Sequence, residues 1–472
     1  MNVVVVGCGN VGFETVRLLA DGHTLLVVSR SYPEDVRRFV DEHASVSFVQ
    51  ADATDREAMS QALADFGNRS GDIDALISTV GFPGSGSALD GFEQFKEDFD
   101  ANLFGNLIPV KAVLEHMLAQ RRGKIIVISS TSGVHTYPGW GAYAPVKWAL
   151  TNLCRTLRAE LAPEGICVNV VFPRTIKNER SKTFLNRAGI EPQQVAREVV
   201  RVLEQKKGRD RFVPKRYELL RPLERVFPQM LDKKAGLRKD RRTHFSSRPV
   251  QTVLINGATS PLGRELAGCY AATAQTLYLL GSDEQALSEV AQGLSEQAQG
   301  TITPLLLRGT EAGDIRNIAA TTGRVDAVIS CDTSSREEAL ASVSRENCER
   351  HLTASFFAPL ALLMEYLRRG MQPQKIINIL STAAATGCPG QGCIAAGQAA
   401  LWAQTRSIRR TLGNDVQVME VLLSSSRQGA QAVREAAERI HRAEQRGREM
   451  LVLPSRSRTA LYLDAICPGV FA

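Results

Sequence analysis

The feature that most constrains this chain is a long internal repeat. Residues 123–150 align with residues 374–401 at an offset of 251, so that Ser130 lies over Ser381. A repeat of this length indicates that a whole domain has been duplicated. At 472 residues the chain is also too long for one ordinary hydrophobic core. We therefore expect two similar domains in tandem.

Each half alternates short Val/Ile/Leu runs with helical segments. This alternation predicts βαβ units, and hence a parallel sheet covered on both faces. The fold class we expect is α/β, with two Rossmann-like, doubly wound domains. We expect the first domain at residues 1–235, a basic linker at 236–250, and the second domain at 251–472.

Glycines follow the first apolar run directly. Residues 7–12, GCGNVG, form a GxGxxG pattern between a strand and a helix. In this setting the glycines permit a tight turn, backbone approach to a pyrophosphate and close helix packing, while the helix N-terminus faces the phosphates. The pattern predicts dinucleotide binding by Gly7, Gly9, Asn10, Val11 and Gly12.

Polar residues end the next two predicted strands. Ser29 and Arg30 end the second strand, where NAD sites usually carry an acidic residue. An arginine can instead pair with a 2′-phosphate, which favours NADP(H), although a surface arginine without contacts is the alternative. Asp52, followed by Ala53, ends the third strand, where it would meet the adenine or, equally, cap the following helix.

Four further residues suit carbonyl chemistry. Tyr143 and Lys147 form YxxxK, Ser130 lies 13 residues before the tyrosine, and Asn102 lies 28 residues before the serine. Lys147 is one helical turn from Tyr143, so its ammonium can lower the pKa of the phenol from about 10. Ser130 can hydrogen-bond a substrate oxygen during hydride transfer.

These residues and spacings resemble the Asn-Ser-Tyr-Lys tetrad of classical short-chain dehydrogenases/reductases, and the resemblance covers essentially all of residues 1–230. It implies that Lys147 also binds the nicotinamide ribose and that Asn102 supports a proton relay through water. Other family motifs add four expected cofactor contacts: Val80, Gly81, Pro173 and Ile176. The glycine pattern departs from the family's TGxxxGxG, and Arg174 replaces a glycine, where it would disturb the nicotinamide pocket or reach the substrate.

The second half lacks this chemistry. Isoleucine has no proton to exchange, and glutamine carries no charge that could shift a pKa. The glycine turn also contains Pro261, and Ser282 or a neighbour takes the place of Arg30. We predict no catalysis and weak or absent dinucleotide binding in 251–472. At offset 251, Ile394, Gln398 and Thr353 replace Tyr143, Lys147 and Asn102, and only Ser381 is retained.

A silent copy can still have a structural role. Classical family members pair through the helices that carry the tyrosine and the asparagine, and a tethered copy could supply that partner within one chain. Apolar residues at Ile394, Leu401, Ile408 and Leu412 predict a buried face. We expect an intramolecular pseudo-dimer, and further homodimerisation stays open.

The net charge of +7 is unevenly distributed. Residues 197–248 hold 17 Lys or Arg against 7 Asp or Glu, which indicates either a solvated linker or attraction to an acidic partner or an anionic membrane surface. Residues 217–231 resemble tails of family members that handle lipid or acyl ketones, and would form a pocket wall, a membrane contact or plain packing. An acyl chain on an acidic acyl carrier protein is one candidate substrate.

The remaining features are mostly exclusions. Nine cysteines are scattered without a CxxC pair, which predicts no metal site and, without a leader, reduced thiols in the cytoplasm. No apolar run reaches the roughly 18–20 residues of a membrane span, and no nucleic-acid partner is expected.

We predict an NADPH-dependent ketoreductase acting on a 3-oxoacyl thioester, polyketide or lipid ketone. The alternatives are a non-enzymatic NADP(H)-binding scaffold or sensor, and an epimerase or dehydratase of the same family.

Overall fold

Two parallel sheets of the same strand order make up the molecule. The computed structural model describes residues 1–82, 92–136, 141–177, 189–226, 249–331, 338–413, 415–424 and 429–453. The first sheet runs β3-β2-β1-β4-β5-β6-β7 and the second β10-β9-β8-β11-β12-β13-β14, with parallel pairing throughout. The predicted fold class, two doubly wound α/β units in tandem, is confirmed.

The first unit alternates strands and helices along the chain. Its strands are β1 Asn2–Val6, β2 Thr24–Ser29, β3 Val46–Gln50, β4 Ala75–Ser78, β5 Gly123–Ile128, β6 Ile166–Pro173 and β7 Asp210–Val213. Its helices are α1 Asn10–Leu19, α2 Glu34–Glu42, α3 Arg56–Ser70, α4 Phe92–Phe99, α5 Gly105–Gln120, α6 Tyr143–Leu161, α8 Pro192–Leu203 and α9 Leu220–Val226. A π-helical turn, η1 Asp100–Phe104, joins α4 to α5.

The second unit repeats this order. Its strands are β8 Thr252–Asn256, β9 Thr276–Gly281, β10 Thr301–Leu306, β11 Ala327–Ser330, β12 Lys375–Ser381, β13 Gln417–Leu423 and β14 Met450–Leu453. Its helices are α11 Pro261–Ala271, α12 Glu284–Leu294, α13 Ala312–Thr322, α14 Arg345–Leu352, α15 Ala358–Arg368, α16 Ala383–Thr386, α17 Gly392–Leu412 and α18 Ala430–Gln445. A π-helical turn, η6 Thr353–Phe357, joins α14 to α15 in the same way.

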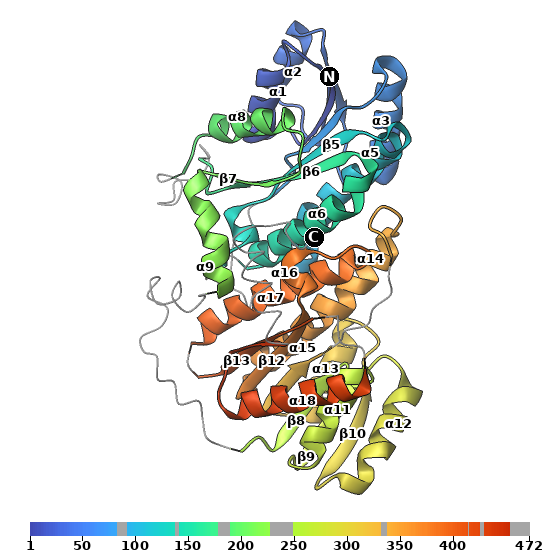
Figure 1. The fold of residues 1–472 in the computed structure, drawn as a ribbon, viewed down its shortest axis with the longest axis vertical. Helices are drawn as coiled ribbons and strands as arrows, with labels where there is room; N and C mark the ends of the chain where they lie inside the picture. The colour runs from blue at the N-terminus through green and yellow to red at the C-terminus, as the bar shows by residue number, and fades with distance from the viewer. Residues whose placement is uncertain are drawn as a thin grey trace.

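Helices cover both faces of each sheet, because the central strands are apolar on both sides. In the first unit α1, α2 and α8 pack on one face and α3, α5 and α6 on the other. In the second unit α11 and α18 pack on one face, and α13, α15 and α17 on the other. Figure 1 shows the two sheets above and below a central pair of helices, α6 and α17.

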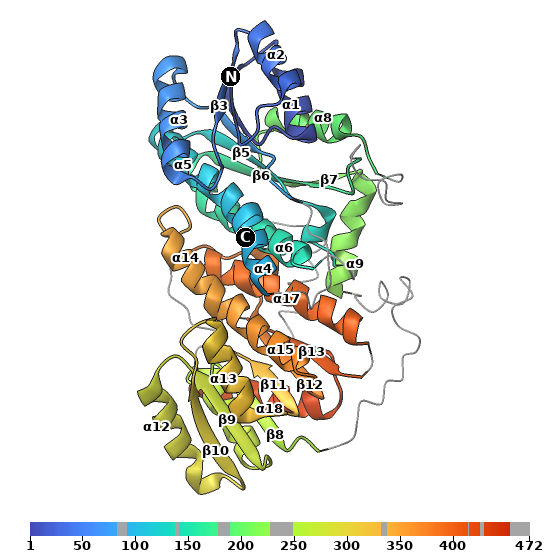
Figure 2. The same cartoon turned by 180° about the vertical axis from the view of Figure 1, so that it is seen from behind.

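One hydrophobic core spans both units at this helix pair. Trp148 of α6 meets Trp402 of α17 edge to face, with ring centroids 5.3 Å apart. Nearby, Phe99 of α4 stacks on Phe356 of η6 at 5.0 Å. Viewed from behind, α6 again lies against α17 (Figure 2). The two units thus form the expected intramolecular pseudo-dimer.

The predicted buried face of α17 is confirmed at three of its four positions. Ile394, Leu401 and Ile408 are buried, whereas Leu412, at the end of the helix, is only partly buried. The expected linker at 236–250 lies mostly outside the described residues. The limits 1–235 and 251–472 therefore stay a prediction.

Candidate active site

The turn after β1 is open where a phosphate would bind. Gly7 has a φ of +89°, which glycine adopts without strain. A Cβ on Gly12 would lie 2.1 Å from the Gly7 carbonyl oxygen, so only glycine lets α1 pack this closely. Gly9 is the N-cap and no side chain caps the helix, which leaves the N–H groups of Asn10, Val11 and Gly12 available. The turn therefore has the geometry of an anion site at a helix N-terminus.

Polar side chains beyond β2 and β3 lie together. Arg30 Nη1 is 3.6 Å from Asp52 Oδ2, and the Arg30 guanidinium carbon lies 4.6 Å from the centroid of the Phe82 ring. Partial burial opposes ionisation of Asp52, but two hydrogen bonds from Thr54 and the charge of Arg30 lower its pKa. Asp55, not Asp52, caps α3, with 3.0 Å between Oδ1 and the N–H that it accepts. The alternatives of a helix-capping Asp52 and of an arginine without contacts are both wrong.

The smaller predicted contacts lie at the same edge of the sheet. Ser29 Oγ accepts a hydrogen bond from the backbone of the glycine turn at 3.3 Å. Ala53 and Pro173 are buried, and Val80 packs against the large core. Ile176 forms a short β-bridge just after β6. All five follow or end strands whose carboxyl ends meet at this edge, which is where ligands bind in open parallel sheets.

Tyr143 begins α6, and its phenol hydrogen-bonds with the Ser130 side chain just beyond β5. Ser130 Oγ also accepts the N–H of Ser132 at 3.1 Å, which fixes the position of the hydroxyl. Burial raises the pKa of Tyr143, and the bond with Ser130 opposes this rise only in part. The expected net lowering of this pKa is therefore wrong, although an ammonium at this position still favours the phenolate over the phenol. The ammonium lies 5.6 Å from the ring centroid, and the effect of burial is larger.

Lys147 is a buried cation, only 2% exposed. Burial lowers its pKa to about 8. A Cβ on Gly81 would lie 2.9 Å from Lys147 Nζ and 3.5 Å from Asn102 Oδ1, so these groups meet across a space that only glycine leaves open. Among the residues that the structure describes, none accepts a hydrogen bond from Nζ or forms an ion pair with it. The structure thus brings Asn102, Ser130, Tyr143 and Lys147 together, with unused donors on the ammonium.

Asn102 is held by the π turn η1 and its neighbours. Its Nδ2 donates to the carbonyl of Asp98 at 3.1 Å, and its Oδ1 accepts the N–H of Phe82 at 3.0 Å. Asn106, fully buried one turn later, donates from Nδ2 to the Asn102 carbonyl at 2.7 Å. The sequence analysis missed Asn106, although a polar residue four positions after Asn102 in an apolar helix was the available signal.

Arg174, which replaces a family glycine, points toward the segment after β7. Its guanidinium carbon lies 5.5 Å from the centroid of the Tyr217 ring, and its N–H donates to the carbonyl of Val213 at 3.0 Å. Residues 178–188, which follow, lie outside the described residues. Whether Arg174 reaches a substrate stays a prediction.

The segment 217–226 packs within the protein. Arg221 of α9 is buried and pairs with Asp210 at 3.1 Å, while Leu219 is 65% exposed. Glu224 is fully buried. This favours the packing interpretation for the described part of 217–231. The pocket wall and the membrane contact stay predictions, because residues 227–231 are not described.

A buried ionic network connects the active-site surroundings to the second unit. His135, five residues after Ser130, pairs with Glu224 of α9. Arg410 of α17 donates to both carboxylate oxygens of Glu224, at 3.0 and 3.2 Å, and also to Thr136. Burial opposes ionisation, but the charges of His135 and Arg410 lower the pKa of Glu224 to about 2. The second unit thus fixes both α9 and the segment that follows β5.

At the corresponding positions of the second unit, two polar side chains accept backbone N–H groups of their own fold. Gln398 Oε1 accepts the N–H of Ser381 at 2.9 Å. Ser381 Oγ accepts the N–H of Ala383 at 3.1 Å, in the same kind of turn that Ser130 makes. Ile394 is buried and apolar. A neutral side chain thus replaces the ammonium and uses its acceptor within the fold.

One expected correspondence is wrong. The two π turns begin at 100 and 353, which makes their offset 253 rather than 251. Asn102 is third in its turn, and Ser355 is third in the other. Ser355 Oγ donates to the carbonyl four residues earlier, as Asn102 Nδ2 does. Ser355, not Thr353, is therefore the counterpart of Asn102. The π turn of the second half lies two residues later in the chain than an offset of 251 would place it.

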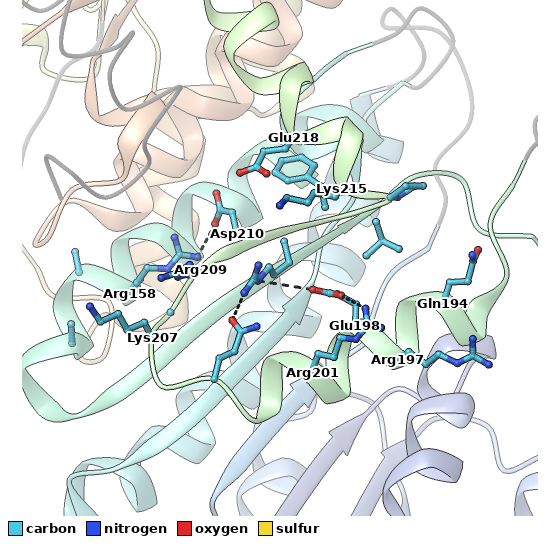
Figure 3. A pocket seen from close by; sticks show the side chains of 18 of the residues that line it. Arg158, Gln194, Arg197, Glu198, Arg201, Lys207, Arg209, Asp210, Lys215 and Glu218 are labelled. Carbon is cyan, nitrogen blue, oxygen red and sulfur yellow. Dashed lines mark hydrogen bonds and ion pairs between the residues drawn. The ribbon is translucent and has the colours of Figure 1, made fainter.

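Part of the basic stretch lines a separate hollow. A pocket of about 1140 Å³ lies along the edge strand β7, between α8 and the end of α6 (Figure 3). Several of its cations pair locally: Arg158 with Asp210 at 2.7 Å, and Arg201 with Glu198 at 3.3 Å. The residues that line it do not include the four of the candidate active site, Asn102, Ser130, Tyr143 and Lys147. This hollow is therefore separate from the candidate active site.

The described part of the chain lacks two features. Within it, no group of three or more His, Cys, Asp or Glu is arranged to hold a metal ion. Nor does any helix there combine the length and the apolar character needed to cross a membrane.

Known proteins resemble one half of the chain in sequence. An uncharacterized oxidoreductase of Listeria monocytogenes is 30% identical over 193 residues, which are 39% of this chain and 78% of that protein. A 3-ketodihydrosphingosine reductase of Dictyostelium discoideum is 31% identical over 195 residues, covering 36% of this chain and 58% of that one.

One solved fold that extends over both halves is the N-domain of a bacterial malonyl-CoA reductase, crystallised with NADP. It matches with a TM-score of 0.69 at 17% identity, over 96% of this chain and 97% of that one. At this identity the likeness shows the fold alone, here for the two units together. The family model for short chain dehydrogenases matches residues 1–188 and again residues 251–437. The chain therefore belongs to the short chain dehydrogenase family of oxidoreductases, with both of its halves derived from that fold.

Proposed function

We propose that the first half is an NADP(H)-dependent ketoreductase, with Tyr143 as proton donor, and that the second half is non-catalytic. In this proposal residues 1–235 form the catalytic domain and residues 251–472 the silent one. The observation that carries it is the buried ammonium of Lys147 beside Tyr143 and Ser130, which has no ion-pair or hydrogen-bond partner among the described residues. A fold does not keep an unpaired buried cation for stability, because burying an unpaired charge is unfavourable.

Three features of the described residues fit the cofactor. The uncapped start of α1 suits the pyrophosphate, and Arg30, at the end of β2, suits a 2′-phosphate. The space that Gly81 leaves beside Lys147 suits the nicotinamide ribose, whose hydroxyls would accept the unused donors of Nζ. NADP in the malonyl-CoA reductase domain of the same fold agrees with this choice. When bound, the cofactor supplies the hydride.

The residues of the chain supply the proton and orient the carbonyl. Ser130 donates its hydroxyl hydrogen to the carbonyl oxygen, which holds the carbon in place for hydride attack. Tyr143 transfers its proton to the same oxygen as negative charge develops there. The ammonium of Lys147, charged below a pKa of about 8, stabilises the phenolate that remains. Asn102 accepts the N–H of Phe82 and so fixes the backbone next to Gly81, which lies against the Lys147 ammonium.

For the substrate we propose a ketone on an apolar chain: a 3-oxoacyl thioester, a polyketide or a lipid ketone. The relationship to a reductase named for 3-ketodihydrosphingosine supports a lipid-like ketone. An acyl carrier protein is the proposed carrier if the substrate is protein-bound, since basic residues of 197–226 gather on one surface (Figure 3).

The test is NADPH consumption by the full-length protein with a panel of ketones, including an N-acetylcysteamine 3-oxoacyl thioester. We expect Tyr143→Phe to lower kcat by about 10²- to 10⁴-fold, as for the loss of a general acid. Ser130→Ala and Ser381→Ala form a matched pair, because both serines accept a backbone N–H two residues later. Only the first should lose turnover.

Two results would contradict the proposal. Activity that survives Tyr143→Phe would exclude this residue as the proton donor. Cofactor binding without net NADPH consumption on any ketone would favour a scaffold or, if substrate is isomerised, an epimerase.

A further inference from the structure

The second half retains a large cleft at the edge of its sheet that corresponds to the cofactor edge of the first. The cleft measures about 1080 Å³ and is lined from the carboxyl ends of β8, β9, β12 and β13 and from α17 and α18. This volume is at the upper end of small-molecule sites. Apolar side chains such as Leu307, Ile394 and Val433 form much of its wall. Loss of catalysis has therefore not been accompanied by filling of the cleft.

The start of α11, at one end of this cleft, offers fewer free N–H groups to a phosphate than the start of α1 does. α11 begins with Pro261, which has no N–H, and the hydroxyl of Ser260 accepts the N–H of Gly263 at 3.0 Å. The same hydroxyl donates to the carbonyl of Gly257 at 2.7 Å. Of the first three helical N–H groups, only that of Leu262 stays available, whereas α1 offers all three.

The lining of the cleft also carries positive charge. Arg308 stands two residues beyond the end of β10, where Asp52 stands two residues beyond the end of β3. Arg350 and Arg439 also line the cleft. Across the residues described for this chain, none of these three arginines has an acidic partner. Glu435, the one described carboxylate in the lining, accepts a hydrogen bond from Gln431.

The floor of the cleft holds polar groups that the fold does not use. Asn256 ends β8 and is 95% buried, yet its carboxamide has no hydrogen-bond partner in the described chain. The residue that ends β1 in the first half is Val6, which lies in the core. Gln398 uses its Oε1 on Ser381, but its Nε2 is likewise unpartnered within the described residues. Both residues line the cleft, so their unpartnered amide groups are available to bond with a ligand there.

We propose that this cleft binds an amphiphilic organic anion: a small molecule with an apolar body, a negatively charged group and a polar end. The negative group would pair with Arg308 and Arg439 at the rim, and the polar end would bond with Asn256 and Gln398 at the floor. The ligand is not a dinucleotide, because the start of α11 is capped by its own side chain. This inference does not depend on the activity proposed for the first half.

The test uses 8-anilino-1-naphthalenesulfonate, an aromatic sulfonate whose fluorescence reports an apolar anion site. The full-length protein is titrated in excess NADP⁺, which is itself non-fluorescent. We expect one saturable site whose Kd rises by about tenfold or more in Arg308→Ser/Arg439→Ser. Asn256→Val, which installs the residue of the first half, should also weaken binding. Arg434→Ser is the matched control, an exposed arginine of α18 that does not line the cleft.

Three outcomes would overturn the proposal. The first is no saturable binding of the sulfonate by the folded wild-type protein. The second is binding that the double arginine variant and Asn256→Val both leave unchanged while circular dichroism shows an intact fold. The third is a calorimetric stoichiometry of two NADPH per chain, with the second site weakened by Arg308→Ser, since the cleft would then be a dinucleotide site.

Discussion

The two halves of this chain share one strand order but satisfy their polar groups differently. The first half leaves the start of α1 uncapped and Lys147 buried with no partner among the described residues. The second half caps α11 with Ser260 and uses Gln398 to accept a backbone N–H. Groups held open at a buried site are unfavourable for folding, so their retention at these two positions in the first copy and their repair in the second distinguish a copy under catalytic demand from one released from that demand.

The strongest way to break this comparison is Lys147→Gln, which gives the first half the residue of the second. We expect kcat to fall by about 10²- to 10⁴-fold, since the phenolate loses its cation. Stability should rise, because folding lowers the lysine pKa from 10.5 to about 8 and so penalises the ammonium. The gain at neutral pH is about 3 kcal/mol by linkage.

The size of this gain depends on pH. Below pH 8 the lysine is charged in both folded and unfolded chains, so the penalty is complete; it disappears as the pH rises toward the unfolded value of 10.5. Urea unfolding at several pH values therefore measures a stability difference that shrinks above pH 8. Lys111→Gln is the comparison: burial lowers the pKa of this lysine too, but its ammonium donates to the carbonyls of Leu340, at 3.3 Å, and Val343, so the substitution also breaks hydrogen bonds and should not give the same gain. A Lys147→Gln protein less stable than wild type would refute the argument.

A second way is to break the link between the halves with Arg410→Met. The substitution removes a cation from the fully buried Glu224, and the loss of one member of such a network costs about 3–5 kcal/mol. The urea midpoint measures the loss. Arg442→Met on α18, where an exposed arginine pairs with Glu438 at 3.5 Å, should change stability by no more than about 0.5 kcal/mol.

The same variant should change the response to acid. The folded pKa of Glu224 is lowered from 4.5 to about 2, so the stability that it contributes is present above pH 4.5 and is lost as the pH falls toward 2. In Arg410→Met this acid-dependent part should be smaller. Equal acid dependence in both proteins would show that Arg410 does not hold this carboxylate ionised.

A third way concerns the cofactor. Arg30 directly follows β2, and Ser282 stands at the same place after β9, so Arg30→Ser gives the first half the residue type of the second. We expect the preference for NADPH over NADH, as a ratio of kcat/KM values, to fall by about 10- to 100-fold, the loss of a charge-assisted bond to phosphate. Arg17→Ser, at an exposed arginine of α1, is the control. An unchanged ratio would remove Arg30 from the cofactor site.

The sequence predicted what repeats locally and missed what depends on distant packing. Alternating apolar runs gave the two sheets, and the spacing from Asn102 to Lys147 gave four residues that do meet. The constant offset paired Asn102 with Thr353 because nothing local reveals that the π turns are shifted by two residues. The network of Arg410 and Glu224 joins residues 186 positions apart, and the raised pKa of Tyr143 follows from burial that only the fold creates.

The finest test exchanges the two helix caps. Gly9→Ser adds to α1 the side chain that Ser260 provides for α11, and it meets no steric obstacle, because nothing lies within 4 Å of a Cβ at Gly9. We expect a gain of a few tenths of a kcal/mol, and a higher KM for NADPH because the serine hydroxyl competes for the N–H of Gly12. Ser260→Gly should lose a similar few tenths and leave NADPH kinetics unchanged. Thermal unfolding and initial rates measure both. A Gly9→Ser protein with unaltered KM would mean that the phosphates do not lie at the start of α1.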